Sequence, residues 1–321
     1  MKDLLKLIFI CSIITSCAQN TKNNMVSSDL MKDIKQVPKA KQITYAIHVN
    51  AKTPYEIYID DIPLPGFGRC YESGMNTTLE LNPYLLGNGI HKLKVRYLPL
   101  ETAKDGLLQP SDVYFNKDAK WNIFFVSYIK DTTDPLGYKG EIDYENSELT
   151  VVPPPNAVPF WDQVFELDIK DLPYELEGWS NSQDLSKIDE DKLSKGVFSF
   201  YNEIREVMNN GDVEKYFNMN SKSDKEIAVA TFDNDLEWYT SDERKNEIIN
   251  DCKDNMLPIN KEDYNLKIYG YGKIIAIERI KKFKNNSLIA RKRIEDNTRY
   301  FAYSFKLHKP KGSDTFEIIR K

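Results

Sequence analysis

Cysteine and histidine are scarce in this chain of 321 residues, which contains four cysteines and three histidines. Four cysteines are too few for the dense disulfide framework of small secreted domains. The histidines lie far apart, and none belongs to a His-x-x-x-His, His-Glu-x-x-His or paired-cysteine pattern, so no zinc motif is present. We therefore expect neither a metal nor a cofactor.

An excess of basic residues is also missing. The chain has 44 Lys and Arg against 49 Asp and Glu, a formal net charge of -5. A dedicated nucleic-acid binder normally carries a strong basic excess, so this class is disfavoured. The sequence contains no Gly-x-Ser-x-Gly elbow and no glycine-rich phosphate loop. We therefore expect no nucleic-acid partner and a protein that is not an enzyme.

Long apolar runs are missing except at the N-terminus, where Leu7 to Ile14 follow a short basic segment. This run covers only about half of the roughly 20 residues that a membrane-spanning helix needs. A basic start followed by a short apolar core is typical of a secretory signal peptide. The alternative, a retained transmembrane anchor, is the weaker interpretation.

The end of this run, Ile14-Thr15-Ser16-Cys17, resembles a bacterial lipobox. The resemblance implies cleavage after Ser16, diacylglyceryl transfer to the sulfur of Cys17 and stable anchoring in a membrane by several acyl chains. The absence of Asp directly after Cys17 implies the outer membrane of a bacterial cell envelope. An ordinary signal peptide with an incidental cysteine is the alternative.

The rest of the chain divides by its apolar periodicity. We expect a signal peptide at 1–16, a polar tether at 17–41, a β-sandwich domain at 42–170, an acidic connector at 171–189 and an α+β domain at 190–321. In the sandwich part the apolar spacing is mostly two, which is typical of strands. Strands are expected at 43–49, 55–59, 77–81, 90–98, 121–129 and 164–169. Such strands favour an antiparallel sandwich of jelly-roll or immunoglobulin-like type.

Two segments of this part, Tyr55-Glu-Ile-Tyr-Ile-Asp-Asp61 and the stretch from Leu79 to Arg96, carry a further similarity. Their strand-loop-strand pattern resembles galactose-binding-like jelly rolls, with Asp60-Asp61 in place of the family's Asn-Gly. The resemblance implies a sandwich fold more than sugar binding.

The final part begins with helical periodicity. Apolar residues from Leu193 to Met208 share one face, Gly211 fits the residue after a helix end, and Asp212 can cap the next, short helix. Capping boxes are expected at Ser223 to Glu226 and at Thr240 to Glu243, each starting a further helix. Strands at 266–271, 274–280, 288–294, 299–307 and 315–319 then suggest an antiparallel meander.

The segment from Phe200 to Phe217, with its Gly211-Asp212 turn, resembles the NTF2-like group, a fold class of α+β type that includes cystatin-like sheets. The resemblance implies a long helix leading into further helices and a curved sheet with a cone-shaped cavity. Aromatic residues that could line this cavity are Tyr201, Phe217, Trp238 and Tyr239. Simple core packing is the alternative for all four.

Charge is distributed unevenly along the chain. Residues 266–321 carry 15 basic and 5 acidic side chains, whereas residues 190–265 carry 10 and 18. A basic face for an acidic partner is therefore a hypothesis, and its members are Lys281, Lys282, Lys284, Arg291, Lys292 and Arg293. Solvated hairpin ends that protect strand edges are the alternative.

These patterns predict a lipid-anchored envelope protein that acts as a non-catalytic interaction module. Its partner would be the membrane, through Cys17, together with another protein, for example a toxin that an immunity lipoprotein neutralises. Binding of glycan or cell wall through the sandwich is one alternative, and a small-molecule enzyme in an NTF2-like cavity is another. A calcium loop formed by Asp131, Asp134, Glu141, Asp143 and Glu145, and a disulfide between Cys70 and Cys252, are weaker possibilities.

Overall fold

The computed structural model describes residues 34–51, 54–65, 75–98, 101–104, 107–110, 121–131, 133, 137–139, 146–152, 154, 158–233 and 235–321. The expected signal peptide, the lipidation site Cys17, Cys70 and most of the acidic stretch after Asp131 lie outside these residues. All statements below concern the described part.

Antiparallel strands form the first half. One sheet has the order β10-β8-β1-β4, with β9 paired to β8, and a second has the order β11-β5-β2-β3. Their bounds are β1 Ile43–Ala51, β2 Tyr55–Ile59, β3 Ile62–Pro63, β4 Met75–Glu80, β5 Gly89–Tyr97, β8 Trp121–Lys130, β9 Tyr138–Lys139, β10 Glu148–Leu149 and β11 Trp161–Ile169. A separate hairpin consists of β6 Glu101–Lys104 and β7 Leu107–Pro110. The expected strand periods are confirmed, with ends displaced by up to three residues.

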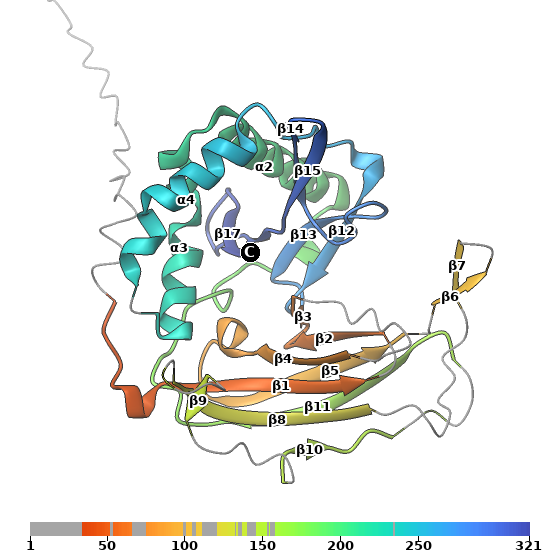
Figure 1. Cartoon of the computed structure of the whole chain (residues 1–321), viewed down its shortest axis with the longest axis vertical. Coiled ribbons are helices and arrows are strands. Elements are labelled where there is room, and N and C mark those ends of the chain that lie inside the picture. Colours follow the sequence, from red (N-terminus) through yellow and green to blue (C-terminus); the bar gives the residue numbers. More distant parts are fainter. Residues whose placement is uncertain are drawn as a thin grey trace, which may run out of the picture.

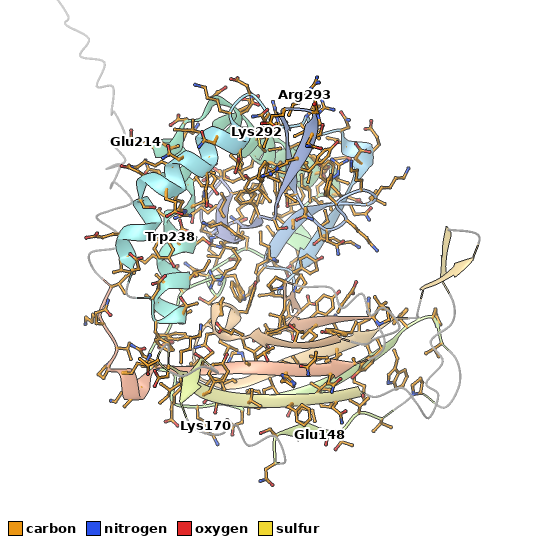
Figure 2. The ribbon with its side chains drawn as sticks, viewed as in Figure 1. Glu148, Lys170, Glu214, Trp238, Lys292 and Arg293 are labelled. Carbon is orange, nitrogen blue, oxygen red and sulfur yellow. The ribbon has the colours of Figure 1, made fainter. Side chains whose placement is uncertain are left out.

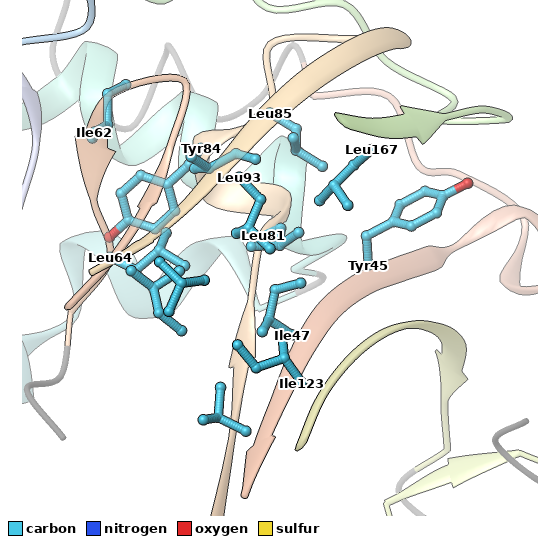
Figure 3. Packing of buried hydrophobic residues seen from close by; sticks show 14 of the residues in the cluster. Tyr45, Ile47, Ile62, Leu64, Leu81, Tyr84, Leu85, Leu93, Ile123 and Leu167 are labelled. Carbon is cyan, nitrogen blue, oxygen red and sulfur yellow. The ribbon is translucent and has the colours of Figure 1, made fainter. Parts of the chain in front are cut away.

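Alternation along these strands places one apolar row of each sheet in a shared core. Ile47 and Val49 of β1 and Leu93 and Val95 of β5 are fully buried there. Figure 3 shows Ile47 and Ile123 of the first sheet packed in this core with Leu93 of the second. The two sheets therefore pack as a sandwich, because each has one apolar face to remove from water.

The second half combines helices with another antiparallel sheet. Its helices are α2 Glu190–Asn210, α3 Val213–Thr231 and α4 Asp242–Glu247, and the last continues as a π-helical turn, η5 Ile248–Cys252. The sheet has the order β12-β13-β16-β17, with β12 Tyr264–Tyr269, β13 Ile274–Arg279, β16 Lys306–His308 and β17 Glu317–Arg320. Strands β14 Leu288–Ile294 and β15 Asn297–Tyr303 form a hairpin of their own. The described residues thus have a mixed α+β fold (Figure 1).

Short 3-10 segments complete the described structure. They are η1 Lys39–Lys41, η2 Asn82–Tyr84, η3 Leu185–Lys187, η4 Leu236–Thr240 and η6 Lys261–Asp263. In this part of the chain, none of the helices has both the length and the apolar character needed to cross a lipid bilayer.

The ends of α2 follow the sequence signals. Asp189 accepts a hydrogen bond from the amide of Lys192 at 3.0 Å, and Gly211 ends the helix with φ of 68°. A positive φ is inexpensive for glycine, so this residue is suited to the helix end. Asp212 then accepts from the amide of Lys215 and starts α3, as its spacing predicts.

Two other predictions in this part are wrong. Ser223 does not start a helix, because α3 runs without a break through Ser223 and Asp224 to Thr231. The carboxylate of Asp224 instead binds Arg244 at 2.8 Å from inside the molecule. The start of α4 lies one residue later than expected, at Ser241, which accepts from the amide of Arg244. A capping box is a local pattern, and here long-range ion pairing outweighs it.

The expected meander is also interrupted. β13 pairs with β16 rather than with the next strand along the chain, and the β14–β15 hairpin leaves the sheet between them. This hairpin packs elsewhere, since Leu288 and Ala290 belong to the core beneath α2. The predicted single strand at 299–307 accordingly divides into β15 and β16.

The third sheet contributes buried side chains to two cores, one on each of its faces. Ile275 and Ile277 of β13 pack with α2, whereas Ile274 of the same strand and Ile319 of β17 belong to the core of the sandwich. The sheet therefore lies between the helices and the sandwich (Figure 1). Where it diverges from the sandwich, the facing surfaces are left open to a ligand.

Candidate functional site

A cleft of about 710 Å³ lies between the outer surface of the sandwich and the third sheet. This volume is in the range of small-molecule sites, about 300–1,000 Å³. One wall consists of side chains from β2 and β5 that point away from the sandwich core. The opposite wall comes from β12, β13, β16 and the turn between β13 and β14. The cleft is thus built from segments some 200 residues apart in the sequence.

The sandwich wall carries paired charges. The hydroxyl of Tyr58 donates to Glu56 Oε2 at 2.7 Å, and Lys94 Nζ lies 4.1 Å from the centre of the Tyr58 ring. Arg96 donates two hydrogen bonds of 2.7 Å to Asp162. This bidentate pair raises the pKa of the Arg96 guanidinium and holds it in place. Charge on this wall is therefore largely satisfied within the protein.

On the opposite wall, burial shifts the pKa values of a carboxyl and an ammonium group. The hydroxyl of Tyr269 donates to Glu278 Oε1 at 2.7 Å, and burial raises the pKa of the Glu278 carboxyl. Burial lowers the pKa of the Lys306 ammonium to about 8, although the Glu278 carboxylate acts in the opposite direction. Both groups are half-buried. Each is thereby shifted toward its uncharged form, which is the expected effect of desolvation.

Seven cationic side chains line the cleft, and four of them already have partners. Arg96 binds Asp162, Lys94 lies 3.6 Å from Asp61, Arg279 donates to Tyr264, and Lys321 pairs with Asp224. The remaining three come from three different elements: Lys267, Lys284 and Lys306. Their ammonium groups make no hydrogen bond or ion pair with another described residue.

The acidic side chains of the cleft do not balance these lysines. Glu56 and Glu278 each accept a tyrosine hydroxyl, and Asp61 accepts from the amide of Tyr271 as well as facing Lys94. Cationic side chains therefore outnumber carboxylates in the cleft, seven to three, and Glu278 is the carboxylate that acts on Lys306 and Lys267 through its charge. Chemically, this arrangement can bind an anion that carries more than one oxygen ligand.

The six residues of the hypothesised basic face come from the turn after β13 and from β14, and Lys282 Nζ lies 4.0 Å from the ring of Tyr300, the strand partner of Arg291. Lys284 lines the cleft, while Lys281 and Lys282 are exposed in the same turn. Lys292 and Arg293 are on β14, at the end of the molecule far from Lys170 and Glu148 of the sandwich (Figure 2). Lys292 lies 3.7 Å from Asp251, and Arg291 is exposed. Their role as a docking face stays a prediction.

The four aromatic residues expected near a cavity also occupy different places. Tyr201 and Phe217 are buried in the core between α2 and the third sheet, and the hydroxyl of Tyr201 donates to the carbonyl of Phe305. Tyr239 is buried in a small cluster with Ala228. Trp238 is labelled in Figure 2. Its side chain is 42% exposed and lines a second hollow, of about 570 Å³, with four acidic neighbours. None of the four lines the cleft between the sheets.

Metal and thiol chemistry have little basis in the described residues. Within them, no three His, Cys, Asp or Glu side chains gather closely enough to hold a metal ion. Cys252 is a free, buried thiol that donates to the hydroxyl of Tyr303 at 3.0 Å. Burial raises the pKa of this thiol to about 11, which keeps it protonated and unreactive.

Comparisons of the chain with protein-family models, with curated proteins and with solved structures give no match. The residues of the cleft are therefore interpreted from their own geometry.

Sequence reasoning found Lys284 but missed Lys267, Lys306 and Glu278. The sequence nevertheless contains a pattern that could have identified Lys306. Lys306 interrupts the apolar run between Phe305 and Leu307, which are both almost fully buried. A charged residue between two core residues of a strand must point to the other face, where its charge needs either water or a partner.

Proposed function

We propose that this chain is a lipid-anchored lipoprotein of the bacterial cell envelope, attached to the outer membrane through Cys17. The lipobox-like sequence Ile14-Thr15-Ser16-Cys17 and the polar residues that follow it support this proposal. In this view the protein acts without turnover, as a binding module held near the membrane surface.

The ligand that we propose for this module is a small, multiply charged anion bound in the cleft between the sandwich and the third sheet. The single observation that supports it is the convergence of Lys267, Lys284 and Lys306 without partners among the described residues. Three ammonium groups in one cleft repel one another, and an anion relieves this repulsion. Hydrogen bonds to charged groups contribute about 1.5–3 kcal/mol each, so a few suffice for specific binding.

The anchor is tested by metabolic labelling with a radioactive fatty acid in a bacterial host. Wild-type protein should incorporate the label and sediment with membranes, whereas Cys17→Ser should do neither. Cys252→Ser is the matched control, because its thiol is buried in the folded protein. Equal labelling of wild type and Cys17→Ser would overturn the proposed anchor.

The cleft is tested by titrating the full-length protein, kept soluble in detergent, with citrate as the probe anion. Calorimetry should give saturable binding that weakens with added salt. Lys284→Met should weaken it about tenfold, since 1.4 kcal/mol corresponds to a factor of ten. Lys281→Met is the matched control, because Lys281 is exposed in the same turn but does not line the cleft. Equal effects of the two variants, or no citrate binding, would overturn this site.

The exposed residues on the β14–β15 hairpin support a second candidate. Arg291 and Arg293 point away from the core, and a partner with an acidic surface would complement them. Such a partner could be a toxin bound by an immunity lipoprotein, and loss of binding in Arg291→Glu would distinguish it from citrate binding in the cleft.

The finer fold assignments belong to the same proposal. The sandwich is proposed to be of jelly-roll, galactose-binding-like type, a class whose relation to glycans motivates cell-wall binding as an alternative function. The long helix α2 and the turn at Gly211-Asp212 are the features behind the proposed NTF2-like character of the second half, and behind the enzyme alternative.

A further inference from the structure

Lys306 occupies a distinctive position in the floor of the cleft. Lys267 of β12 pairs with Ala276 of β13, and the pairing of β13 with β16 places Lys306 on the other side of Ala276. The three residues thus form one row across three strands, on the face turned to the sandwich. Because Ala276 is small, space remains above it between the two lysines.

The ammonium of Lys306 lacks the partners that half-buried lysines normally have. No described residue bonds to it, and the nearest charges that influence it are Glu278 and Arg320. With a pKa of about 8, roughly a quarter of the side chain is free amine at pH 7.5, against about one part in a thousand for an ordinary lysine. A free amine is a nucleophile, whereas an ammonium is not.

An acid lies close to this amine. Glu278 is on the same face of β13, two residues beyond Ala276, and its carboxyl is held by the hydroxyl of Tyr269. Burial raises the pKa of this carboxyl, and a carboxyl group at this position can give a proton to a leaving oxygen. Arg320 of β17 is the strand partner of Lys306. Besides Lys267, the other charged residues that line the cleft are Glu56, Asp61, Lys94 and Arg96 on the sandwich, Arg279 and Lys284 at and after the end of β13, and Lys321 after β17.

We propose that Lys306 is a covalent capture site for an aldehyde that carries an anionic group. This inference rests on the proposed anion binding and names the chemical class of the ligand. The anionic group lies against Lys267 and Lys284, which brings the carbonyl carbon to Lys306. In this arrangement Lys267 and Lys284 hold the anionic group without forming a covalent bond to the ligand.

The bond changes are those of imine formation. The Lys306 ammonium first loses a proton to water. The amine nitrogen then attacks the carbonyl carbon as the C=O π bond breaks, and a proton passes from the attacking nitrogen to the oxygen to give a neutral carbinolamine. The carbinolamine loses its hydroxyl group as water with a proton from the Glu278 carboxyl, and the iminium that results returns its nitrogen proton to the Glu278 carboxylate. Amine and aldehyde thus give imine and water, and nothing is oxidised or reduced.

The test uses pyridoxal phosphate as the probe, because it combines an aldehyde with a dianion. The full-length protein is incubated with the probe, reduced with borohydride and digested, and the modified lysines are identified by mass spectrometry. Modification at Lys306 should exceed that at Lys292 at least tenfold, and excess citrate should suppress it. Modification spread evenly over the exposed lysines would overturn the inference.

Two further measurements separate this inference from the proposed function. Lys306→Arg should abolish the specific modification, because a guanidinium forms no imine with the probe, whereas Lys292→Arg, the control, should leave it unchanged. Citrate titration of the wild-type protein tests the anion site separately. Should Lys306→Arg fail to fold, the pH dependence of Lys306 modification in the wild-type protein tests the inference instead. Modification of Lys306 should be half-maximal near pH 8, and a midpoint above pH 10 would contradict the inference. Loss of citrate binding with retained modification would contradict only the anion site.

Discussion

At the scale of single residues, buried charges join distant parts of the chain. Arg320 is 1% exposed, and its guanidinium binds Glu226 Oε2 of α3 at 2.7 Å and the carbonyl of Pro83 in the sandwich. Glu226 also accepts from the amide of Gly178 at 2.8 Å. One carboxylate therefore fixes three segments, which explains why so polar a residue occupies a buried helical position.

Replacing this carboxylate tests how much the ion pair contributes. Glu226→Gln should lower the free energy of unfolding by about 3 kcal/mol, because Arg320 is left as an uncompensated buried charge. Urea denaturation measures the change. Glu214→Gln, on the exposed first turn of the same helix, is the control and should cost less than about 1 kcal/mol. Similar losses in both variants would contradict the assigned role of Glu226.

His91 gives the sandwich a dependence on pH. Its Nδ1 lies 2.6 Å from Asp60 Oδ2 and its Nε2 lies 3.0 Å from the carbonyl of Gly87. Burial alone would lower the pKa of His91, but the hydrogen bond and charge of Asp60 outweigh it, so the pKa is raised. A raised pKa in the folded state means that the folded state holds the proton more tightly than the unfolded chain.

The stabilisation by His91 should therefore be present below about pH 6.5, the ordinary histidine pKa, and be lost as the pH rises through the folded pKa. Denaturation at pH 5.5 and pH 8.5 should show a larger difference between wild type and His91→Gln at the lower pH. His48 is the contrast, because burial lowers its pKa and the pH trend of His48→Gln should be reversed. A pH-independent difference for His91→Gln would contradict this linkage.

At the scale of elements, local signals predict local structure well. The caps of α2 and the start of α3 at Asp212 are set within a few residues, so the sequence pattern suffices to locate them. The capping box at Ser223 fails because Asp224 has a partner, Arg244, twenty residues further on. The pairing of β13 with β16 likewise depends on long-range contacts. Apolar periodicity locates both strands but does not show which strand each one pairs with.

The contrast between local signals and long-range contacts also explains which residues of the candidate site can be predicted from the sequence. Lys284 is exposed in a charged turn and is visible in composition. Lys306 and Glu278 acquire their properties only from burial between two sheets, one of which is formed by a much earlier part of the chain. A pKa shift of this origin depends on tertiary packing and leaves little trace in the local sequence.

The β14–β15 hairpin offers a test of local backbone strain. Ile294 pairs with Asn297, so Glu295 and Asp296 form the turn, and Glu295 has φ of 53°. A non-glycine residue in this conformation costs about 1–2 kcal/mol, part of which glycine loses again through its flexible unfolded state. Glu295→Gly should therefore raise the free energy of unfolding by about 0.5–1 kcal/mol in thermal or urea denaturation.

Asp296→Gly is the matched control, because Asp296 is not in the positive-φ region. Glycine there only increases the freedom of the unfolded chain, so the expected change is a loss of about 0.5–1 kcal/mol. If both glycine variants lowered stability, the strain assigned to Glu295 would be contradicted.

At the scale of the whole molecule, the third sheet belongs to two cores at once. Ile274 and Ile319 are fully buried against the sandwich, while their neighbours Ile275 and Ile318 are buried beneath the helices. Adjacent residues of one strand therefore pack in the cores of different halves of the chain. This sharing also fixes the cleft, because its two walls cannot separate without exposing Ile274 and Ile319.

Shared burial predicts that both halves unfold in one transition. Truncation of a buried isoleucine costs about 2–5 kcal/mol, so Ile274→Ala should lower the urea midpoint substantially while the transition stays single. Hydrogen exchange measured by mass spectrometry should show that peptides from β5 and from α2 lose protection together. Ile268→Ala is the control, since this side chain of β12 is 37% exposed, and it should change stability by only about 0.5 kcal/mol. If Ile274→Ala released the sandwich and left α2 protected, the two halves would be independent units and the cleft between them would not be a fixed site.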